Sequence, residues 1–133
     1  MKKVAVLTSG GDCQGMNAAI RAVVRSALAA KLDIVGFQKG YYGLIHDLAD
    51  PMTTRSVSGI LQRGGTFLQS ARCPDMHTPD GLDAAVATLQ RHQVEGLVVI
   101  GGDGSLRGAR ALHARGIPVI GIPASIDNDI PFT

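Results

Sequence analysis

The 133-residue sequence predicts an α/β fold, a doubly wound parallel sheet with helices on both faces. Apolar runs at residues 4–7 and 97–100 each lead through glycines into a stretch with helical periodicity. Such strand–turn–helix units are typical of parallel strands that are joined by crossover helices. The composition agrees: 45% of the residues are hydrophobic, only 4% are aromatic, and 17 are glycine. This suits one compact domain, or part of one, with an aliphatic core and many tight turns.

The first half of the chain predicts two strands and two helices. Residues 3–8 form the first strand, and the apolar residues of positions 16–28 recur at the spacing of a helix packed on a sheet. Residues 34–37 give a short second strand, which is followed by a loop at residues 40–43. A modest helix is expected around residues 57–61.

The second half begins with an irregular stretch, residues 63–76, that we expect to be a long loop with a functional role. Thr78 followed by Pro79 has the pattern of an N-cap with proline at the first helical position, and an apolar stripe follows. The remaining elements are a strand at 96–100, a helix at 105–115 and a strand at 118–122.

Charge and cysteine content exclude several classes of function. The formal net charge is +2 and the basic residues are scattered, so we expect no nucleic-acid or membrane surface. The apolar run near the start is too short for a signal peptide, which makes the cytoplasm the expected location. We expect Cys13 and Cys73 to be free thiols, because a hydrophobic α/β chain without an export signal does not depend on a disulfide. The four histidines show no metal-ligand spacing with each other or with the cysteines, so we expect them to lie at the surface.

Acidic residues and glycines follow three of the predicted strands, at residues 10–12, 101–105 and 125–129. Ligands of open α/β sheets gather at the carboxyl ends of strands, so these turns are expected to face one crevice. At residues 101–105 the glycines let the backbone approach a polyphosphate, and the N-terminus of the next helix favours its charge. Asp103 can bind a divalent cation on the same oxygens. By itself, this motif could instead be a tight turn in which Asp103 caps the helix.

Five further charged residues are candidates for binding or transferring phosphoryl groups. Asp127 and Asp129 project to one side of an extended segment, where one can take a proton and the other can hold a metal ion or the acceptor. The alternative is a plain turn. Arg72 could brace a transferred phosphoryl group, or it is a surface arginine. Arg21 and its neighbour one turn on, Arg25, could hold an anion between them, or they belong to a solvated helix face.

Several motifs, in the same order along essentially the whole chain, resemble the bacterial ATP-dependent 6-phosphofructokinases; they are residues 10–21, 63–68, 70–72, 101–105 and 126–129. The combination is more specific than the Gly-Gly-Asp-Gly-Ser turn, which is similar in NAD kinases and diacylglycerol kinases. The resemblance implies a phosphofructokinase-like, Rossmann-type three-layer fold. It also implies transfer of the ATP γ-phosphoryl group to the 1-hydroxyl of fructose 6-phosphate with Mg²⁺, the committing step of glycolysis.

The resemblance assigns roles to individual residues. Asp127 would be the general base, Asp103 would hold Mg²⁺, and Arg72 would steady the transferred phosphoryl group. The acceptor sugar would be contacted by Ser125, Ile126, Asp127 and Asp129, the last lying close to the metal. The nucleotide site would comprise Gly11, Tyr41, Arg72, Cys73, Gly102, Asp103, Gly104, Ser105 and Gly108.

Gly104 favours ATP as the donor, because pyrophosphate-using relatives carry an aspartate there that would repel the α-phosphate. Ala124 stands where ATP enzymes typically have glycine and pyrophosphate enzymes have lysine. Two alternatives stay open, namely a pyrophosphate-dependent phosphofructokinase and a non-catalytic nucleotide-binding regulatory module.

The resemblance also implies regulation and assembly. Arg21, Arg25 and Arg55 would contribute to an effector site for ADP or phosphoenolpyruvate, although Thr54 and Gly59 replace an arginine and an aspartate typical of it. We expect residues 1–133 to be an incomplete fold, the N-terminal ATP-binding part of a longer protein whose substrate-binding half is absent here. The isolated chain would then be inactive, and the full-length protein would be a homotetramer.

Overall fold

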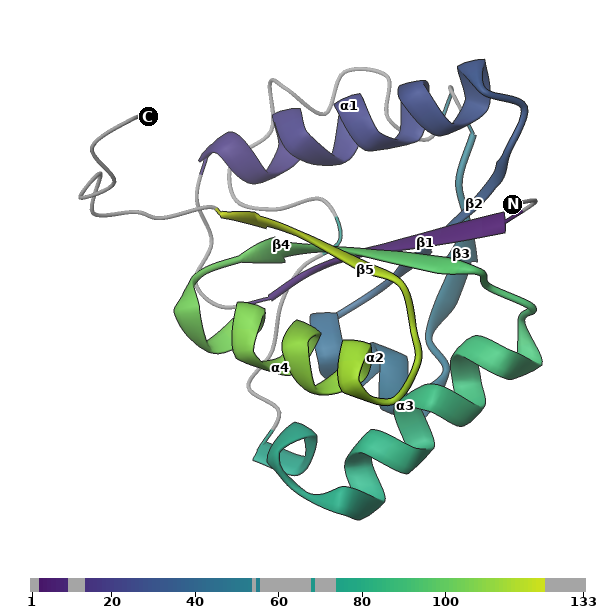
Figure 1. Ribbon diagram of the computed structural model, residues 1–133. Coiled ribbons are helices and arrows are strands. Elements are labelled where there is room, and N and C mark those ends of the chain that lie inside the picture. The colour runs from purple at the N-terminus through teal and green to yellow at the C-terminus, as the bar shows by residue number, and fades with distance from the viewer. Residues whose placement is uncertain (1–2, 10–13, 54, 56–67, 69–73, 124–133) are drawn as a thin grey trace.

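The protein contains a five-stranded sheet with the strand order β3-β2-β1-β4-β5, as the computed structural model in Figure 1 shows. The structure describes residues 3–9, 14–53, 55, 68 and 74–123. β1 (Lys3–Thr8) pairs in parallel with β2 (Asp33–Phe37) and with β4 (Gly96–Gly101), and β4 pairs in parallel with β5 (Val119–Pro123). The short strand β3 (Ala49–Pro51) runs antiparallel to β2 at the edge. The predicted parallel sheet is confirmed, with one antiparallel strand added.

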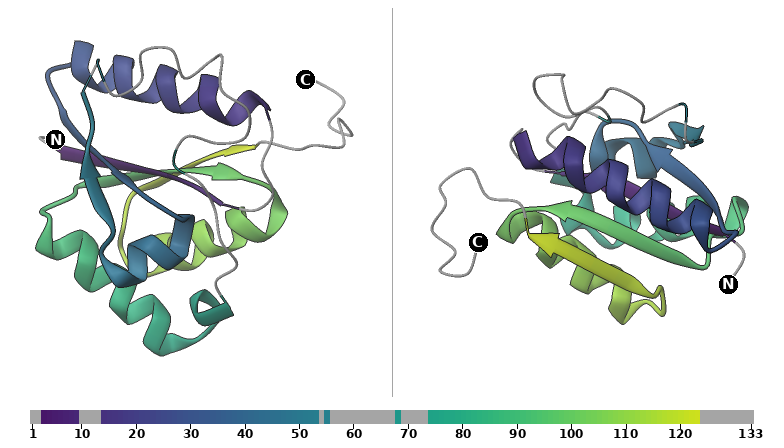
Figure 2. Two further views of the ribbon diagram at one scale, coloured as in Figure 1. Left: turned by 180° about the vertical axis from the view of Figure 1, so that it is seen from behind. Right: turned by 90° about the horizontal axis from the view of Figure 1, so that it is seen from above.

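Helices cover both faces of the sheet, as the doubly wound fold requires. α1 (Gln14–Ala29) lies on one face. α2 (Gly40–His46), α3 (Pro79–Arg91) and α4 (Asp103–Ala114) lie on the other, and the left view in Figure 2 shows this separation. A short 3₁₀ helix, η3 (Pro74–His77), precedes α3. No helix in these described ranges is both long enough and apolar enough to cross a membrane.

The core consists of two apolar clusters, one on each face of the sheet. Because successive side chains of a strand point to opposite faces, Val6 packs with α1 whereas Leu7 packs with α2 to α4. Ile100 and Val99 of β4 divide in the same way. This two-sided burial explains why β1 and β4 are continuous apolar runs in the sequence.

The start of α3 confirms the capping prediction. The Thr78 hydroxyl accepts a hydrogen bond from the Gly81 amide at 3.1 Å, and Pro79 occupies the first turn, where its missing N–H is not needed. α4 begins at Asp103, two residues before the predicted start. It ends at Ala114, just before Gly116, whose φ is +92°.

The prediction of a loop at residues 40–43 is wrong, because these residues begin α2. Burial of Tyr41 and Leu44 against the sheet favours the helix over the open turn that the two glycines indicated. Lys39 and Asp47, both in the left-handed conformation, flank it. Neither β3 nor η3 was predicted. The expected helix around residues 57–61, and residues 63–73 of the expected loop apart from Leu68, lie outside the described residues.

The prediction that the histidines lie at the surface is confirmed in part. His46, His77 and His113 are exposed, but His92 is half-buried at the end of α3, with its ring edge against Phe37. Cys13 and Cys73 lie outside the described part of the chain.

Candidate functional site

The turns after β1 and β4 meet at the carboxyl edge of the sheet. The Ser9 amide donates a hydrogen bond to the Ile100 carbonyl oxygen at 2.9 Å, which joins the ends of the two strands. Gly101 is buried here, and a β-carbon at this position would lie 2.4 Å from the Ser9 carbonyl oxygen and 2.5 Å from the Ser105 hydroxyl oxygen. Only glycine allows this close approach.

The strand that leads to the third predicted turn ends beside the same point. In the register of β4 and β5, Pro123 is the partner of Gly101. The three strands that precede the predicted turns therefore end side by side in the sheet. Residues 10–13 and 124–133, which make up most of the first turn and all of the third, lie outside the described structure.

The N-terminus of α4 opens at this edge. Gly102 is extended (φ −90°, ψ −161°), and its carbonyl accepts the first helical hydrogen bond, from the Leu106 amide at 3.0 Å. The N-cap residue, Gly102, has no side chain with which to cap the helix. Because the first amides of a helix have no partner within it, they can donate to an anion, which the helix dipole also favours.

Gly104 leaves open space on the first turn of α4. The residue is exposed, and a β-carbon there would meet none of the described atoms within 4 Å. The packing of the described residues therefore does not require glycine at this position, in contrast to Gly101. A larger side chain would instead occupy space above the turn.

Tyr41 and Gly108 form a buried contact behind the same turn. The Tyr41 side chain is only 5% exposed, and its hydroxyl donates to the Ser105 carbonyl oxygen at 2.5 Å. Burial raises the pKa of this hydroxyl above its ordinary value, so it stays protonated and remains a donor. A β-carbon at Gly108 would lie 2.8 Å from the Tyr41 ring. The hydroxyl is thus bonded to α4 itself.

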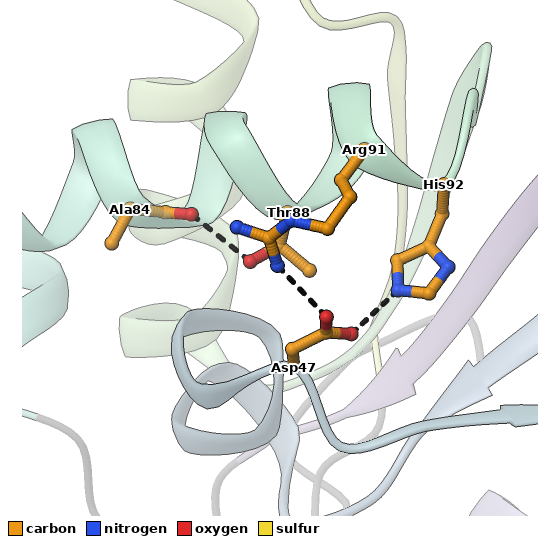
Figure 3. Close-up of polar contacts among 5 residues, drawn as sticks. All are labelled: Asp47, Ala84, Thr88, Arg91 and His92. Carbon is orange, nitrogen blue, oxygen red and sulfur yellow. Dashed lines mark hydrogen bonds and ion pairs between the residues drawn. The ribbon is translucent and has the colours of Figure 1, made fainter.

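Two contacts fix the helix α2 that carries Tyr41. Gly40, with φ +60°, approaches the end of β1 so closely that a β-carbon would lie 2.6 Å from the Thr8 carbonyl oxygen. At the other end, Asp47 accepts hydrogen bonds from Arg91 Nη1 at 2.8 Å and from His92 Nε2 at 2.5 Å, as Figure 3 shows. The bond from His92, followed by that from Arg91, lowers the pKa of the Asp47 carboxyl. α2 is therefore tied both to the sheet and to α3.

The predicted effector residues are not brought to this edge by any described contact. Arg21 is half-buried and Arg25 is exposed, one turn apart on α1, which covers the opposite face of the sheet from α4. Arg55 is exposed. Thr54 and Gly59, the departures from the expected effector pattern, lie outside the described residues.

The structure thus gathers five predicted nucleotide-site residues around the first two turns of α4: Tyr41, Gly102, Gly104, Ser105 and Gly108. Seven other residues predicted for the nucleotide and sugar sites lie outside the described residues, namely Gly11, Arg72, Cys73, Ser125, Ile126, Asp127 and Asp129. The backbone of Asp103 is described as the first residue of α4, but its side chain is not. Gly40 was missed as a residue that positions the site; the available signal was a glycine shortly after the predicted strand at 34–37.

Comparison with known proteins gives consistent matches. The family model described as Phosphofructokinase matches residues 3–133. The chain is 55% identical, over its whole length, to the ATP-dependent 6-phosphofructokinase of Paenibacillus macquariensis and covers 41% of that protein. It is 56% identical to the enzyme of the same name from Macrococcus caseolyticus and covers 42% of it. The chain therefore spans about two fifths of the length of these curated relatives.

Solved structures show the same fold. The phosphofructokinase of Pichia pastoris in the T-state matches with a TM-score of 0.91 and 35% identity, over 96% of this chain and 16% of that chain. The pyrophosphate-dependent phosphofructokinase of Marinobacter aquaeolei matches with a TM-score of 0.84, over all of this chain and 36% of that chain. Its identity is only 20%, so this second likeness concerns the fold alone.

Proposed function

Because the chain belongs to the phosphofructokinase family, we propose that the native protein carrying it transfers the γ-phosphoryl group of ATP to the 1-hydroxyl of fructose 6-phosphate. The observation that carries the proposal is the 55–56% identity, along the whole chain, to two ATP-dependent 6-phosphofructokinases. The products would be fructose 1,6-bisphosphate and ADP. The geometry of the sheet edge supports the donor half of this reaction.

The donor phosphates would lie over the N-terminal turn of α4. Gly101 allows the turns after β1 and β4 to approach each other, and the first amides of α4, which have no partner within the helix, lie at the same edge. Backbone N–H groups at a helix N-terminus bind phosphate oxygens and cost little reorganisation during the reaction. Gly104 supports a nucleotide donor, because it leaves space above the turn that an aspartate would fill with a negative charge.

Asp103 fits a magnesium site. It is the first residue of α4, directly after the turn that we propose for the phosphates, and a carboxylate is a preferred ligand of Mg²⁺. When bound, the ion would neutralise charge on the donor oxygens. Arg72 would add a cation that steadies the transferred group.

Asp127 would take the proton from the 1-hydroxyl of the sugar as it attacks the γ-phosphorus. Asp129 would lie near the metal, and Ser125 with Ile126 would contact the sugar. The register of β5 supports this placement, since Pro123, the last described residue of that strand, pairs with Gly101 beside the donor turn. A general base of this kind contributes about 10²- to 10⁴-fold in rate.

Steady-state turnover of the native protein, with Asp127→Asn as the test variant, checks the proposed base. We expect turnover to fall at least ~100-fold while ATP binding, measured by calorimetry, is kept. Asp50→Asn, at an exposed aspartate of β3, serves as the matched control and should leave turnover unchanged. Unchanged turnover in Asp127→Asn would refute the base. A wild-type protein that binds ATP but phosphorylates no sugar would support a regulatory module instead.

The donor is tested by supplying the wild type with ATP or pyrophosphate in the presence of Mg²⁺. We expect ATP to be the better donor and Gly104→Asp to reduce its use, because the new carboxylate would repel the α-phosphate. Since nothing described lies within 4 Å of the added β-carbon, the variant should stay folded. Faster reaction of the wild type with pyrophosphate would favour the pyrophosphate-dependent alternative.

Regulation and assembly are further parts of the proposal. We infer that Arg21, Arg25 and Arg55 contribute to binding of ADP or phosphoenolpyruvate as effectors, and that the native protein is a cytoplasmic homotetramer. Two of the three arginines lie one turn apart on α1, where a bound anion would relieve their mutual repulsion. Titration of the native protein with either effector, in wild type and in Arg25→Ala, tests the site.

A further inference from the structure

The first two turns of α4 are weak as a helix on their own. Gly104 and Gly108 both lie within them, and glycine is a poor helix former because its backbone loses the most freedom on ordering. The N-cap residue, Gly102, has no side chain with which to cap the N-terminus. A turn that must hold phosphate oxygens in one geometry therefore needs support from outside the helix.

Tyr41 gives that support from behind the turn. Its hydroxyl donates to the Ser105 carbonyl oxygen at 2.5 Å, in the first turn of α4. The side chain is 5% exposed, so the bond is shielded from water. Burial also keeps the hydroxyl protonated by raising its pKa, and the bond therefore persists across the physiological range.

Gly108 makes room for the Tyr41 ring. A β-carbon at this position would lie 2.8 Å from the ring carbon Cζ and 2.9 Å from the hydroxyl oxygen. A side chain at position 108 would therefore point toward Tyr41. The packing of the ring is a sufficient reason for glycine at this position.

The helix that carries Tyr41 is itself fixed at both ends. Gly40 lies against the backbone of β1 at Thr8, and Asp47 is bonded to Arg91 and His92 of α3 (Figure 3). Tyr41 can therefore hold the first turn of α4 at a fixed position relative to the sheet and to α3.

We propose that Tyr41 is a positioning residue, whose hydroxyl holds the Ser105 carbonyl and thereby fixes the α4 turn that receives the donor phosphates. The proposal rests on the proposed function, and it differs from the direct nucleotide contact that the family resemblance implies for Tyr41. Tyr41 acts through α4, and the carbonyl of Ser105 is the atom through which it acts.

The test removes one hydroxyl at each of two neighbouring tyrosines. Tyr41→Phe keeps the ring and loses the bond, whereas Tyr42→Phe, at a side chain that is 40% exposed, is the matched control. In the nucleotide-free native protein, we expect hydrogen exchange at amides 106–109 to rise about five- to tenfold in Tyr41→Phe, the effect of losing one hydrogen bond. Tyr42→Phe should match the wild type. Equal exchange in the two variants would overturn the proposal, whatever the protein's activity is.

Kinetics then separate positioning from general destabilisation. We expect Tyr41→Phe to raise the KM for ATP several-fold at unchanged KM for fructose 6-phosphate. A merely structural loss would lower the amount of active enzyme and leave both KM values as they were, and that result would overturn the proposal. If the wild type transfers no phosphoryl group, the proposed function fails while the exchange experiment still decides the role of Tyr41.

A rescue experiment tests Gly108. Gly108→Ala should weaken ATP binding because the methyl group displaces the ring, and the double variant Gly108→Ala/Tyr41→Leu should recover the thermal stability that Gly108→Ala loses. If glycine is needed at 108 only for close approach of the nucleotide, Gly108→Ala will keep the wild-type stability and the second substitution will rescue nothing. That outcome would refute the packing role assigned to Gly108.

Discussion

Replacement of Gly101 by alanine tests how closely the turns after β1 and β4 meet. The added β-carbon would lie 2.4 Å from the Ser9 carbonyl oxygen and 2.5 Å from the Ser105 hydroxyl oxygen, well inside the 3.4 Å at which ordinary contact begins. The Ser105 hydroxyl can rotate away. The Ser9 carbonyl belongs to the main chain, and the amide of the same residue is bonded to Ile100 at the end of β4. Relief of the contact therefore requires a shift of the main chain, and we expect the strand ends to separate.

Overpacking of this kind costs about 1–3 kcal/mol, and we expect the upper part of that range because one partner is backbone. In a urea titration followed by circular dichroism, a loss of about 2–3 kcal/mol lowers the midpoint by roughly 1–1.5 M at a typical slope of ~2 kcal/mol per M. The separation would also move the first turn of α4, so the KM for ATP should rise. A midpoint equal to that of the wild type would refute the close approach.

The matched control is Gly104→Ala, three residues further on. Here the β-carbon meets nothing described within 4 Å, and alanine is the better helix former, so the free energy of unfolding should rise by about 0.4–1 kcal/mol. If the phosphates occupy the space above this turn, ATP binding should nevertheless weaken. The two substitutions are thus expected to change stability in opposite directions and ATP affinity in the same direction.

Three further substitutions test other parts of the fold. Asp47→Asn should lower the free energy of unfolding at pH 7 by up to ~1 kcal/mol. Because the folded-state pKa of Asp47 lies below its ordinary value of 3.8, this difference between variant and wild type should be full above pH 3.8 and disappear as the pH falls through the folded-state pKa. Urea titrations at several pH values measure it. Thr78→Ala removes the N-cap of α3 and should cost about 1 kcal/mol, measured in the same way, whereas no change would mean that the Gly81 amide finds another acceptor. Leu112→Ala, at a fully buried position of α4, should cost about 2–5 kcal/mol in thermal or urea unfolding, and a cost below ~1 kcal/mol would contradict its place in the core.

The strands and long helices could be predicted because their signals are local. β1 and β4 are continuous apolar runs, which follow from burial on both faces, and the Thr78-Pro79 pair marks the start of α3 by its own chemistry. α2 could not be predicted in this way, because seven residues with two glycines carry no clear helical period. What favours the helix there is burial of Tyr41 and Leu44 beneath the sheet, a contact between segments far apart in the chain.

The sequence by itself determined the fold class, the order of the main elements and the glycine turn between β4 and α4, since periodicity, capping and glycine turns act over a few residues. Only the tertiary structure decided which glycines are needed for packing and which leave space. Gly101 and Gly108 adjoin Ser9 and Tyr41, residues distant in the chain, whereas Gly104 faces none of the described residues. The sequence shows where a glycine stands, but the atom that a side chain at that position would meet depends on how the strands and helices pack.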